Sequence, residues 1–226
     1  MYSRTELLLG EGATEKLKRA RVMVFGIGGV GGYAVEALAR AGIGHLTLVD
    51  FDTVSESNIN RQIIATSSTV GLPKVEAMMQ RIVDINPDAR VEVIPEFYDE
   101  KLGGVLNFSD YDYILDCIDS MKSKTDLILR AHTAGVKIIS AMGAGNKLDP
   151  TRLRVADITK TTTDPLARKI RYELRHQGVP HHKVVFSDEI PRESVGAVGS
   201  MAPVVATMGM IMANEVILDI TGTKIK

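Results

Sequence analysis

The chain has 226 residues, of which 45% are hydrophobic and 24% are charged, as in an ordinary globular protein and unlike a disordered or low-complexity one. Its 27 Lys and Arg residues nearly balance its 28 Asp and Glu residues, so the net charge of −1 gives no global indication of a nucleic-acid partner. The single cysteine, Cys117, excludes an internal disulfide framework and a structural zinc site built from paired cysteines.

The N-terminus lacks a basic segment followed by a long apolar run, so we expect no secretory signal. The lack of a signal and the single free thiol together favour a cytoplasmic location. The least polar stretch, residues 195–213, is almost long enough to span a membrane, but glycines and a proline interrupt its first half. We expect a core or dimer-interface helix that begins near Pro203, and membrane contact is the less favoured alternative.

Strand-length apolar runs alternate with helical patterns between residues 21 and 141, after a short helix expected over residues 11–20. The expected strands cover residues 21–27, 45–50, 90–94, 113–116 and 137–141, and the expected helices cover residues 33–41, 74–85 and 124–134. This alternation is typical of βαβ units. It predicts a Rossmann-like α/β fold whose mostly parallel sheet carries helices on both faces.

After residue 145 the pattern changes to a smaller C-terminal α+β elaboration. It contains expected strands at 153–158 and 183–187, and between them a helix over 164–177 that Asp164 caps and Pro165 begins. We therefore expect a single domain over residues 1–226. It divides into an N-terminal helical arm (1–20), a nucleotide-binding core (21–145) and the C-terminal elaboration (146–226).

A glycine-rich loop, GIGGVGG, follows the first expected strand and precedes a helix. Gly26, Gly28 and Gly31 stand in the G-x-G-x-x-G spacing that lets a backbone turn tightly and approach phosphates at a helix N-terminus. Asp50 ends the second strand about 20 residues later, where an acid can bind ribose hydroxyls. On these features alone, an NAD(P)-dependent oxidoreductase is the default interpretation.

The residues that follow favour ATP. Asn58, Arg61 and Gln62 lie after the second strand and Lys74 follows them, which places two cations near the expected phosphates. A dinucleotide enzyme has little use for them, whereas nucleotidyl transfer must neutralise the charge of departing pyrophosphate. Asp119 follows the fourth strand and can hold Mg²⁺ together with phosphate oxygens.

Two further features have open interpretations. Arg168, Arg171 and Arg175 share one face of the helix over 164–177, opposite its apolar residues, and form either a solvated face or an RNA phosphate contact. His181 and His182 are adjacent but have no carboxylate at ligand spacing, so we expect them in a solvated loop.

The ordered motifs resemble a known family. GIGGVGG, LVDFDTVSESNINRQ, the lysine of VGLPKVEA and the aspartate of CIDS are similar to the ThiF/MoeB/HesA superfamily, the bacterial relatives of ubiquitin-activating enzymes. RTELLLGE, RIVDINPDARVEV, KLDPTRLRVADITKT and DPLARKIRYELR extend the resemblance over nearly the whole chain, toward the tRNA threonylcarbamoyladenosine dehydratases. The resemblance implies an ATP-dependent dehydration that cyclises threonylcarbamoyladenosine next to the anticodon of tRNA. The reaction would proceed through adenylation of the threonyl carboxylate.

The resemblance also implies residue roles. Gly28, Gly29 and Gly31 would line the phosphates, Asp50 would bind the ribose, and Asp52 would belong to the nucleotide site. Asn58, Arg61 and Lys74 would contact ATP phosphates, and Asp119 would bind Mg²⁺. Arg4 would reach the partner subunit's site, so a homodimer is expected, with the C-terminal elaboration serving substrate binding and dimerisation. The catalytic set would therefore be Arg4, Arg61, Lys74 and Asp119.

The resemblance further implies a cysteine desulfurase and its sulfur-acceptor protein as candidate partners, and a monovalent cation (Na⁺ or K⁺) as a candidate cofactor.

An alternative function is an adenylyltransferase that activates the C-terminal glycine of a ubiquitin-like sulfur carrier. The absence of paired zinc cysteines disfavours it. Related dehydratases carry an insertion that contains cysteines in the region that corresponds to residues 178–200. In this chain that region is short and has no cysteine, so a mechanism that needs a thiol there is disfavoured. A non-catalytic nucleotide-binding scaffold is disfavoured because Arg61, Lys74 and Asp119 are all present.

Overall fold

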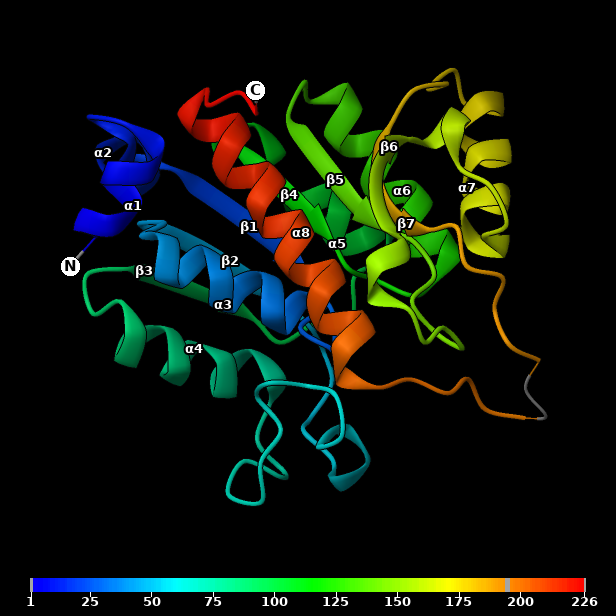
Figure 1. Cartoon of the computed structure of the whole chain (residues 1–226), viewed down its shortest axis with the longest axis horizontal. Coiled ribbons are helices and arrows are strands. Elements are labelled where there is room, and N and C mark those ends of the chain that lie inside the picture. The colour runs from blue at the N-terminus through cyan, green and yellow to red at the C-terminus, as the bar shows by residue number, and fades with distance from the viewer. Residues whose placement is uncertain (1, 194–195, 226) are drawn as a thin grey trace.

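The computed structural model describes residues 2–193 and 196–225. Within them, seven strands form one sheet in the order β3-β2-β1-β4-β5-β7-β6 (Figure 1). The strands are β1 (Arg21–Phe25), β2 (His45–Val49), β3 (Arg90–Ile94), β4 (Tyr113–Asp116), β5 (Lys137–Ala141), β6 (Leu153–Asp157) and β7 (Lys183–Ser187). Every pairing is parallel except that of β6 with β7. The expected Rossmann-like, mostly parallel sheet is confirmed.

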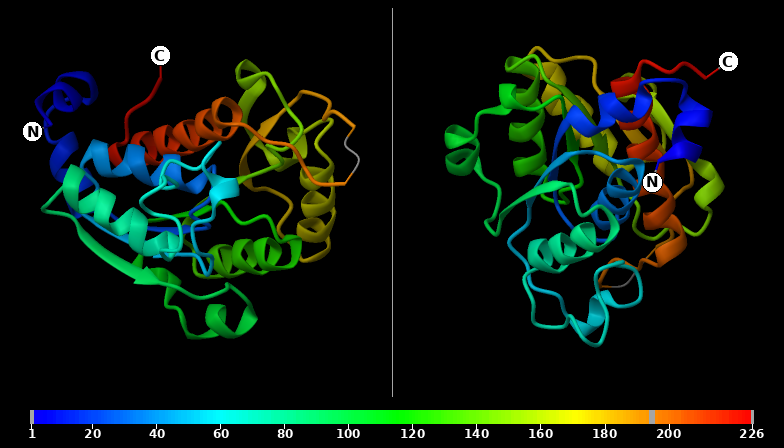
Figure 2. Two further views of the ribbon diagram at one scale, coloured as in Figure 1. Left: turned by 90° about the horizontal axis from the view of Figure 1, so that it is seen from below. Right: turned by 90° about the vertical axis from the view of Figure 1, so that its left-hand side faces the viewer.

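Helices cover both faces of the sheet, as Figures 1 and 2 show. One face carries α2 (Ala13–Arg19), α3 (Gly31–Ala41), α4 (Lys74–Ile85) and α8 (Ala202–Thr221). The other carries α5 (Glu100–Val105), α6 (Met121–Thr133) and α7 (Pro165–His176). The remaining helix, α1 (Ser3–Leu9), precedes α2 in the N-terminal arm. Helices α1 and α5 were not expected individually.

The alternation of side chains along the strands creates two hydrophobic cores. In β1, Val22 and Val24 pack into the core beneath α3 and α8, whereas Met23 and Phe25 pack into the core beneath α6. Neighbouring side chains of a strand point to opposite faces, so a strand buried on both faces must be apolar throughout. This requirement explains why the continuous apolar runs predicted the strand positions well.

The C-terminal elaboration extends the same sheet. Strand β7 pairs with β5, and β6 closes the edge beside it. Helix α7 begins as expected, because the Asp164 carboxylate accepts a hydrogen bond from the Ala167 amide (2.9 Å) and Pro165 occupies the first helical position.

The long apolar helix α8 begins at Ala202 and packs against α3. Met208, Met212 and Val216 are buried in the core beneath it. By length and composition it could cross a membrane, but this is weak evidence, and 44% of the relevant segment is buried inside the protein. Of the apolar stretch 195–213, Val195 lies outside the described residues.

Candidate functional site

The glycine-rich loop connects β1 to α3 through two close backbone contacts. Gly26 has φ +85°, and a Cβ there would lie 2.7 Å from the Cys117 carbonyl oxygen. A Cβ at Gly31 would overlap the carbonyl oxygen of Gly26. Only glycine fits these two positions, because the loop folds back on itself and also touches the chain leaving β4.

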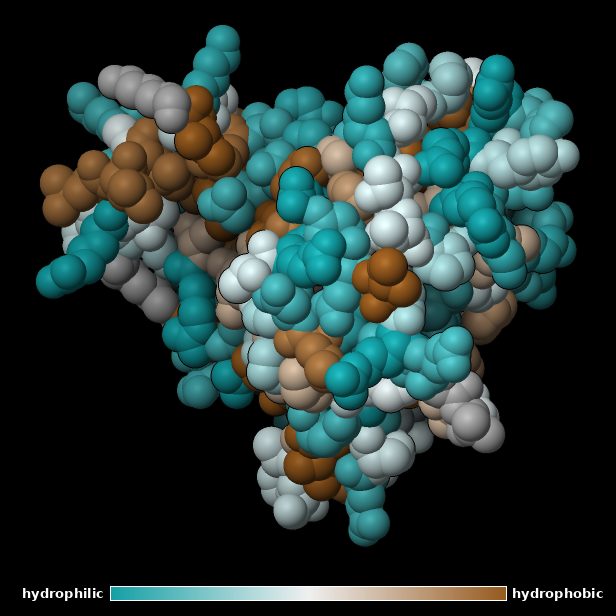
Figure 3. Space-filling view, turned by 45° about the vertical axis from the view of Figure 1, so that its right-hand side comes forward, coloured by the Kyte–Doolittle hydropathy of each residue, from teal (hydrophilic) through white to brown (hydrophobic). Residues whose placement is uncertain are grey.

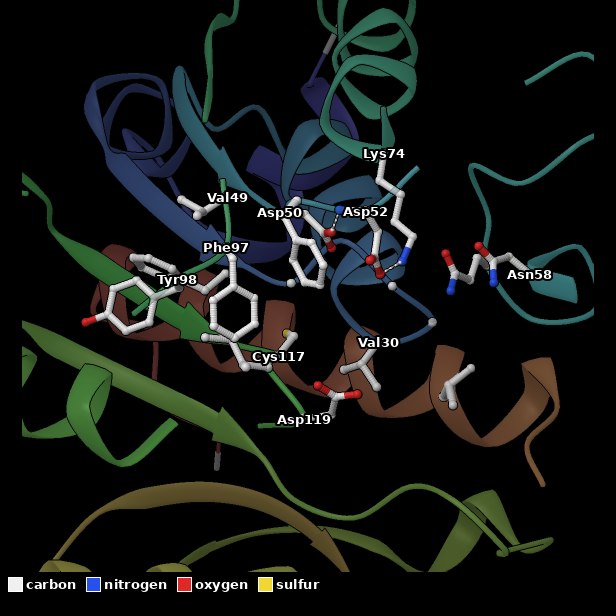
Figure 4. A pocket seen from close by; sticks show the side chains of 18 of the residues that line it. Val30, Val49, Asp50, Asp52, Asn58, Lys74, Phe97, Tyr98, Cys117 and Asp119 are labelled. Atoms are coloured by element: carbon white, nitrogen blue, oxygen red, sulfur yellow. Dashed lines mark hydrogen bonds and ion pairs between the residues drawn. The ribbon is translucent and has the colours of Figure 1, made fainter. Parts of the chain in front are cut away.

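A cavity of about 340 Å³ opens at the carboxyl ends of β1, β2 and β4, beside this loop. The predicted residues that line it are Gly28, Gly29, Asp50, Asp52, Asn58, Arg61, Lys74 and Asp119. Figure 4 shows Asp50, Asp52 and Lys74 on one side of the cavity and Asp119 on another. The carboxyl edge of an open parallel sheet is where such folds bind ligands.

Asp50 is nearly buried and is fixed by the backbone on both carboxylate oxygens. Its Oδ2 accepts a hydrogen bond from the Ile27 amide (2.6 Å), and its Oδ1 accepts one from the Asp52 amide (2.9 Å). Burial raises the pKa of this carboxyl group, while Lys74 and the two amides act in the opposite direction. The remaining lone pairs of the Asp50 carboxylate can accept hydrogen bonds from the hydroxyls of a ribose.

Lys74 begins α4, and its side chain is only 7% exposed. Its ammonium group lies 2.6 Å from Asp52 Oδ2, and its amide donates to the Asp52 carbonyl. Arg61 also lines the cavity, and its Nη1 donates to the Ser57 carbonyl (2.8 Å). Asn58 Oδ1 accepts from the Ser55 amide (3.2 Å), which keeps this polar loop folded.

Asp119 follows β4 in an exposed loop between Asp116 and Ser120. An ion pair beneath this loop joins Asp116 to Lys124 in the first turn of α6, with both side chains completely buried. Asp116 also accepts a hydrogen bond from the Ile118 amide (3.1 Å). The pair therefore joins the start of the loop to the helix that follows it, which limits the positions open to Asp119.

The described residues contain no group of three or more His, Cys, Asp or Glu side chains that could hold a metal ion by themselves. Asp119 therefore belongs to no such group, and its role as a metal ligand stays a prediction. A single carboxylate fits Mg²⁺, which usually takes one or two carboxylates and completes its shell with phosphate oxygens and water.

Cys117 lies at the edge of the cavity but has the features of a structural residue. Burial and the neighbouring Asp116 raise the pKa of its thiol, and its sulfur contacts the Met212 sulfur at 3.9 Å. A thiol with a raised pKa is a poor nucleophile. The predicted structural role is consistent with this geometry.

Some predicted residues lie outside the cavity. Gly31 does not line it, and its close approach to Gly26 explains why a glycine is needed there, while its expected phosphate contact stays a prediction. Arg4 belongs to α1, and no α1 residue lines the cavity. Arg168, Arg171 and Arg175 line a different cavity beside α7.

Several lining residues were not predicted. Phe51 and Phe97 form an edge-to-face pair (centroids 5.0 Å apart) at the cavity, and Glu96 and Tyr98 adjoin Phe97. Residues 96–98 follow the carboxyl end of β3, so the position of that strand end could have indicated them. Gln62 also lines the cavity, and its Oε1 is buried without a hydrogen-bond partner among the described residues, as expected for an atom that faces a ligand.

The expectation of a solvated histidine loop is wrong for His182. This residue is 3% exposed, its Nε2 lies 2.8 Å from Ser140 Oγ, and its Nδ1 lies 3.3 Å from His132 Nε2. Burial lowers the pKa of His182 to about 3, which keeps the ring neutral. His181 is exposed and contacts Asp157 (3.2 Å).

Known proteins resemble this chain over nearly its whole length. The tRNA threonylcarbamoyladenosine dehydratase of Bacillus subtilis is 42% identical over a match that covers 97% of this chain and 94% of that protein. Crystal structures of the Escherichia coli tRNA N6-threonylcarbamoyladenosine dehydratase, TcdA, are similar with 36% identity. The complex with AMP has a TM-score of 0.92 and the complex with ATP one of 0.89, and the match covers 98% of this chain and 94% or 93% of that chain.

A molybdopterin-synthase adenylyltransferase of Haemophilus influenzae is more distant, with 32% identity over 90% of this chain and 75% of that protein. The ThiF family model matches residues 2–226. The chain therefore belongs to the ThiF family.

Proposed function

We propose that this protein is an ATP-dependent tRNA threonylcarbamoyladenosine dehydratase. The observation that carries the proposal is the cavity at the carboxyl ends of β1, β2 and β4, because the glycine loop, the carboxylates of Asp50 and Asp119 and the cations of Arg61 and Lys74 all line it. The B. subtilis relative of that name matches 97% of this chain, and the E. coli protein binds AMP and ATP.

The reaction begins with attack of the threonyl carboxylate on the α-phosphorus of ATP. A carboxyl O–P bond forms, the bond between the α- and β-phosphates breaks, and pyrophosphate leaves. A nucleophilic atom of the same modified nucleoside then attacks the activated carbonyl and loses its proton. The C–O bond to AMP breaks, a ring closes, and the nucleoside has lost the elements of one water.

The chain contributes positioning and charge neutralisation to this chemistry. Asp50 would fix the ribose, while the Gly28–Gly29 backbone would approach the phosphates at the N-terminus of α3. Arg61 and Lys74 would neutralise the charge on pyrophosphate as it departs. Lys74 has to exchange some of its contact with Asp52 for the phosphates, and the exposed Asp52 can then turn toward solvent or Mg²⁺.

Asp119 would hold Mg²⁺, which would offset the negative charge that develops on the phosphates. The Asp116–Lys124 pair would keep the Asp119 loop in place for this contact. A monovalent cation is a further proposed cofactor on the ground of family resemblance.

We also propose a homodimer in which Arg4 serves the partner's site. Tyr2, beside α1, packs on Gly42 just before β2, whereas Asp50 and the cavity follow the opposite end of that strand. Leu7 and Leu8 of α1 are 86% and 82% exposed, and hydrophobic atoms gather over the N-terminal arm in Figure 3. Adjacent exposed leucines of this kind are typical of a surface that a partner covers. Family resemblance adds a cysteine desulfurase and its sulfur-acceptor protein as partners, and a cytoplasmic location.

ATP–pyrophosphate exchange tests the proposed function against its alternative. We expect exchange when tRNA that carries threonylcarbamoyladenosine is present, and none with unmodified tRNA. Exchange that requires a ubiquitin-like carrier protein, and ignores the modified tRNA, would support the adenylyltransferase alternative. No exchange with either substrate, despite ATP binding, would indicate a scaffold.

A further inference from the structure

A second cavity, of about 640 Å³, lies on the outer side of α7 and is called the α7 pocket below. Arg168, Arg171, Tyr172 and Arg175 of the helix line it, together with His181 of the following loop. These helix positions are three or four residues apart, so they share one face over about 10 Å of helix length.

The α7 pocket is strongly positive. Within residues 2–193 and 196–225, none of its three arginines forms an ion pair with a carboxylate, whereas His181 contacts Asp157. These three positive charges therefore lie together without a carboxylate partner in the described part of the chain, although the chain as a whole has a net charge of −1. They attract an anionic partner to this face.

Arg171 is not the freely solvated side chain that its helical position suggested. It is half-buried, and its Nη1 donates to the Ile158 carbonyl (3.3 Å), the Thr161 carbonyl (3.0 Å) and the Thr161 hydroxyl (2.5 Å). These partners are neutral, so they hold the guanidinium group without cancelling its charge. A group fixed in this way loses little conformational entropy when it binds a ligand.

Tyr172 gives the α7 pocket an aromatic surface between the arginines. Its side chain is 62% exposed, and its ring lies 4.3 Å from the His176 ring at an angle of 58°. An exposed aromatic ring surrounded by guanidinium groups is the arrangement that binds unpaired RNA, because bases stack on the ring while phosphates contact the cations. An acidic peptide would use the arginines but would have no need of the ring.

Helix α7 starts at the sheet edge that carries the nucleotide cavity and runs toward the opposite edge, where His181 precedes β7. Lys147 Nζ contacts the capping carboxylate of Asp164 (2.9 Å) and the carbonyl of Gly143 (2.6 Å), which follows the carboxyl end of β5. Helix α7 also packs against α6, which begins just after Asp119. Figure 1 shows α7 as the outermost helix beside this part of the sheet, and the region over it in Figure 3 is largely hydrophilic.

We propose that the α7 pocket binds an unpaired segment of RNA, with its phosphates on Arg168, Arg171 and Arg175 and one base stacked on Tyr172. This inference rests on the proposed function, since it identifies the RNA as the anticodon arm of the substrate tRNA. The nucleotide cavity accommodates the reacting groups, whereas the rest of the arm needs a separate positive surface.

Fluorescence anisotropy with a labelled anticodon stem-loop RNA, measured over a range of salt concentrations, tests this proposal. Arg168→Gln/Arg175→Gln should weaken binding at least tenfold and lower the slope of log K against log salt by about 0.7 per lost contact. Tyr172→Leu should weaken binding by about 5- to 150-fold, the equivalent of the roughly 1–3 kcal/mol per stacked base, and Tyr172→Phe should bind like the wild type.

Matched controls separate this effect from a general loss of charge or fold. Arg90→Gln/Lys101→Gln removes the same charge from exposed positions on β3 and α5 and should leave RNA binding unchanged. The ATP-induced rise in melting temperature should be the same in every variant. Wild-type affinity and salt slope in the arginine double variant, or competition by polyglutamate as effective as by RNA, would overturn the proposal. If the proposed function is wrong, the wild type will leave threonylcarbamoyladenosine unchanged, whatever these binding measurements show.

Discussion

The ammonium group of Lys124 lies 2.8 Å from the carboxylate of Asp116, and both side chains are fully buried beneath the loop that carries Asp119. Each ion of such a pair is stable in the interior only because the other is present. The pair joins β4 to α6 across the Asp119 loop, so it couples the stability of the fold to the geometry of the nucleotide cavity.

Removal of one partner should therefore destabilise the protein strongly. Lys124→Met leaves the Asp116 carboxylate buried and unpaired, and we expect a loss of about 3–5 kcal/mol in the free energy of unfolding, measured by urea denaturation. The double variant Asp116→Asn/Lys124→Met should recover part of that loss. A Lys124→Met variant as stable as the wild type would show that the pair does not stabilise the fold.

The choice of nucleotide can be tested by thermal unfolding. ATP with Mg²⁺ should raise the melting temperature because it binds only the native state, adding about 2.7 kcal/mol when its concentration is 100 times Kd. NAD⁺ should have no such effect. Stabilisation by NAD⁺ and not by ATP would contradict the adenylation chemistry.

Individual charged groups at the cavity should each contribute to the rate. Arg61→Ala, Lys74→Ala and Asp119→Ala should fold but lose activity by about 10²–10³-fold, the scale for removal of one electrostatic contact to a transition state. Cys117→Ala should retain most activity, since its thiol is held protonated by burial. If folded Cys117→Ala were inactive, a thiol mechanism would have to replace the one proposed.

Subunit mixing tests the role of Arg4. Arg4→Ala and Asp119→Ala subunits should each be inactive alone and regain part of the activity when mixed, because one of the two sites in a mixed dimer then has both residues. Subunit exchange has to be demonstrated independently, by mass spectrometry of tagged chains. Exchange without recovery would exclude a contribution of Arg4 to the partner's site.

Acid should destabilise the protein through His182. Its pKa is about 3 in the folded state, below the ordinary value of 6.5, so the unfolded chain binds more protons between these values. The stability that the neutral ring provides is complete above about pH 6.5 and is lost as the pH falls toward 3. His182→Gln, which can still bond Ser140, should unfold in urea with a shallower pH dependence over this range. An identical pH dependence in both proteins would show that His182 is not the titrating group.

The sequence predicted the strands and the nucleotide cavity because both depend on local patterns. Buried parallel strands need unbroken apolar runs, and the glycine loop, Asp50 and Asp119 all follow strand ends, which the topology brings to one edge. The short helix α5 contains two adjacent glycines and little apolar pattern, so it gave no helical signal. The position of Arg4 relative to a site depends on a second subunit.

Other features depend on contacts between distant segments. His182 is buried because β7 pairs with β5, which places its ring beside Ser140, and because α6 places His132 against the other side of the ring. Lys74 and Asp52 are separated by 22 positions and form an ion pair through the fold of the intervening loop. Spacing along the chain could place both residues near the cavity, but it could not reveal their contact.

The most direct measurement of the proposed function is nucleoside mass analysis of tRNA carrying threonylcarbamoyladenosine after incubation with the protein, ATP and Mg²⁺. We expect the nucleoside to lose the mass of one water, with one AMP and one pyrophosphate released for each nucleoside converted. We expect no change without ATP and a rate lower by about 10²–10³-fold with Asp119→Ala. An unchanged nucleoside mass with protein that binds both ATP and the modified tRNA would contradict the account.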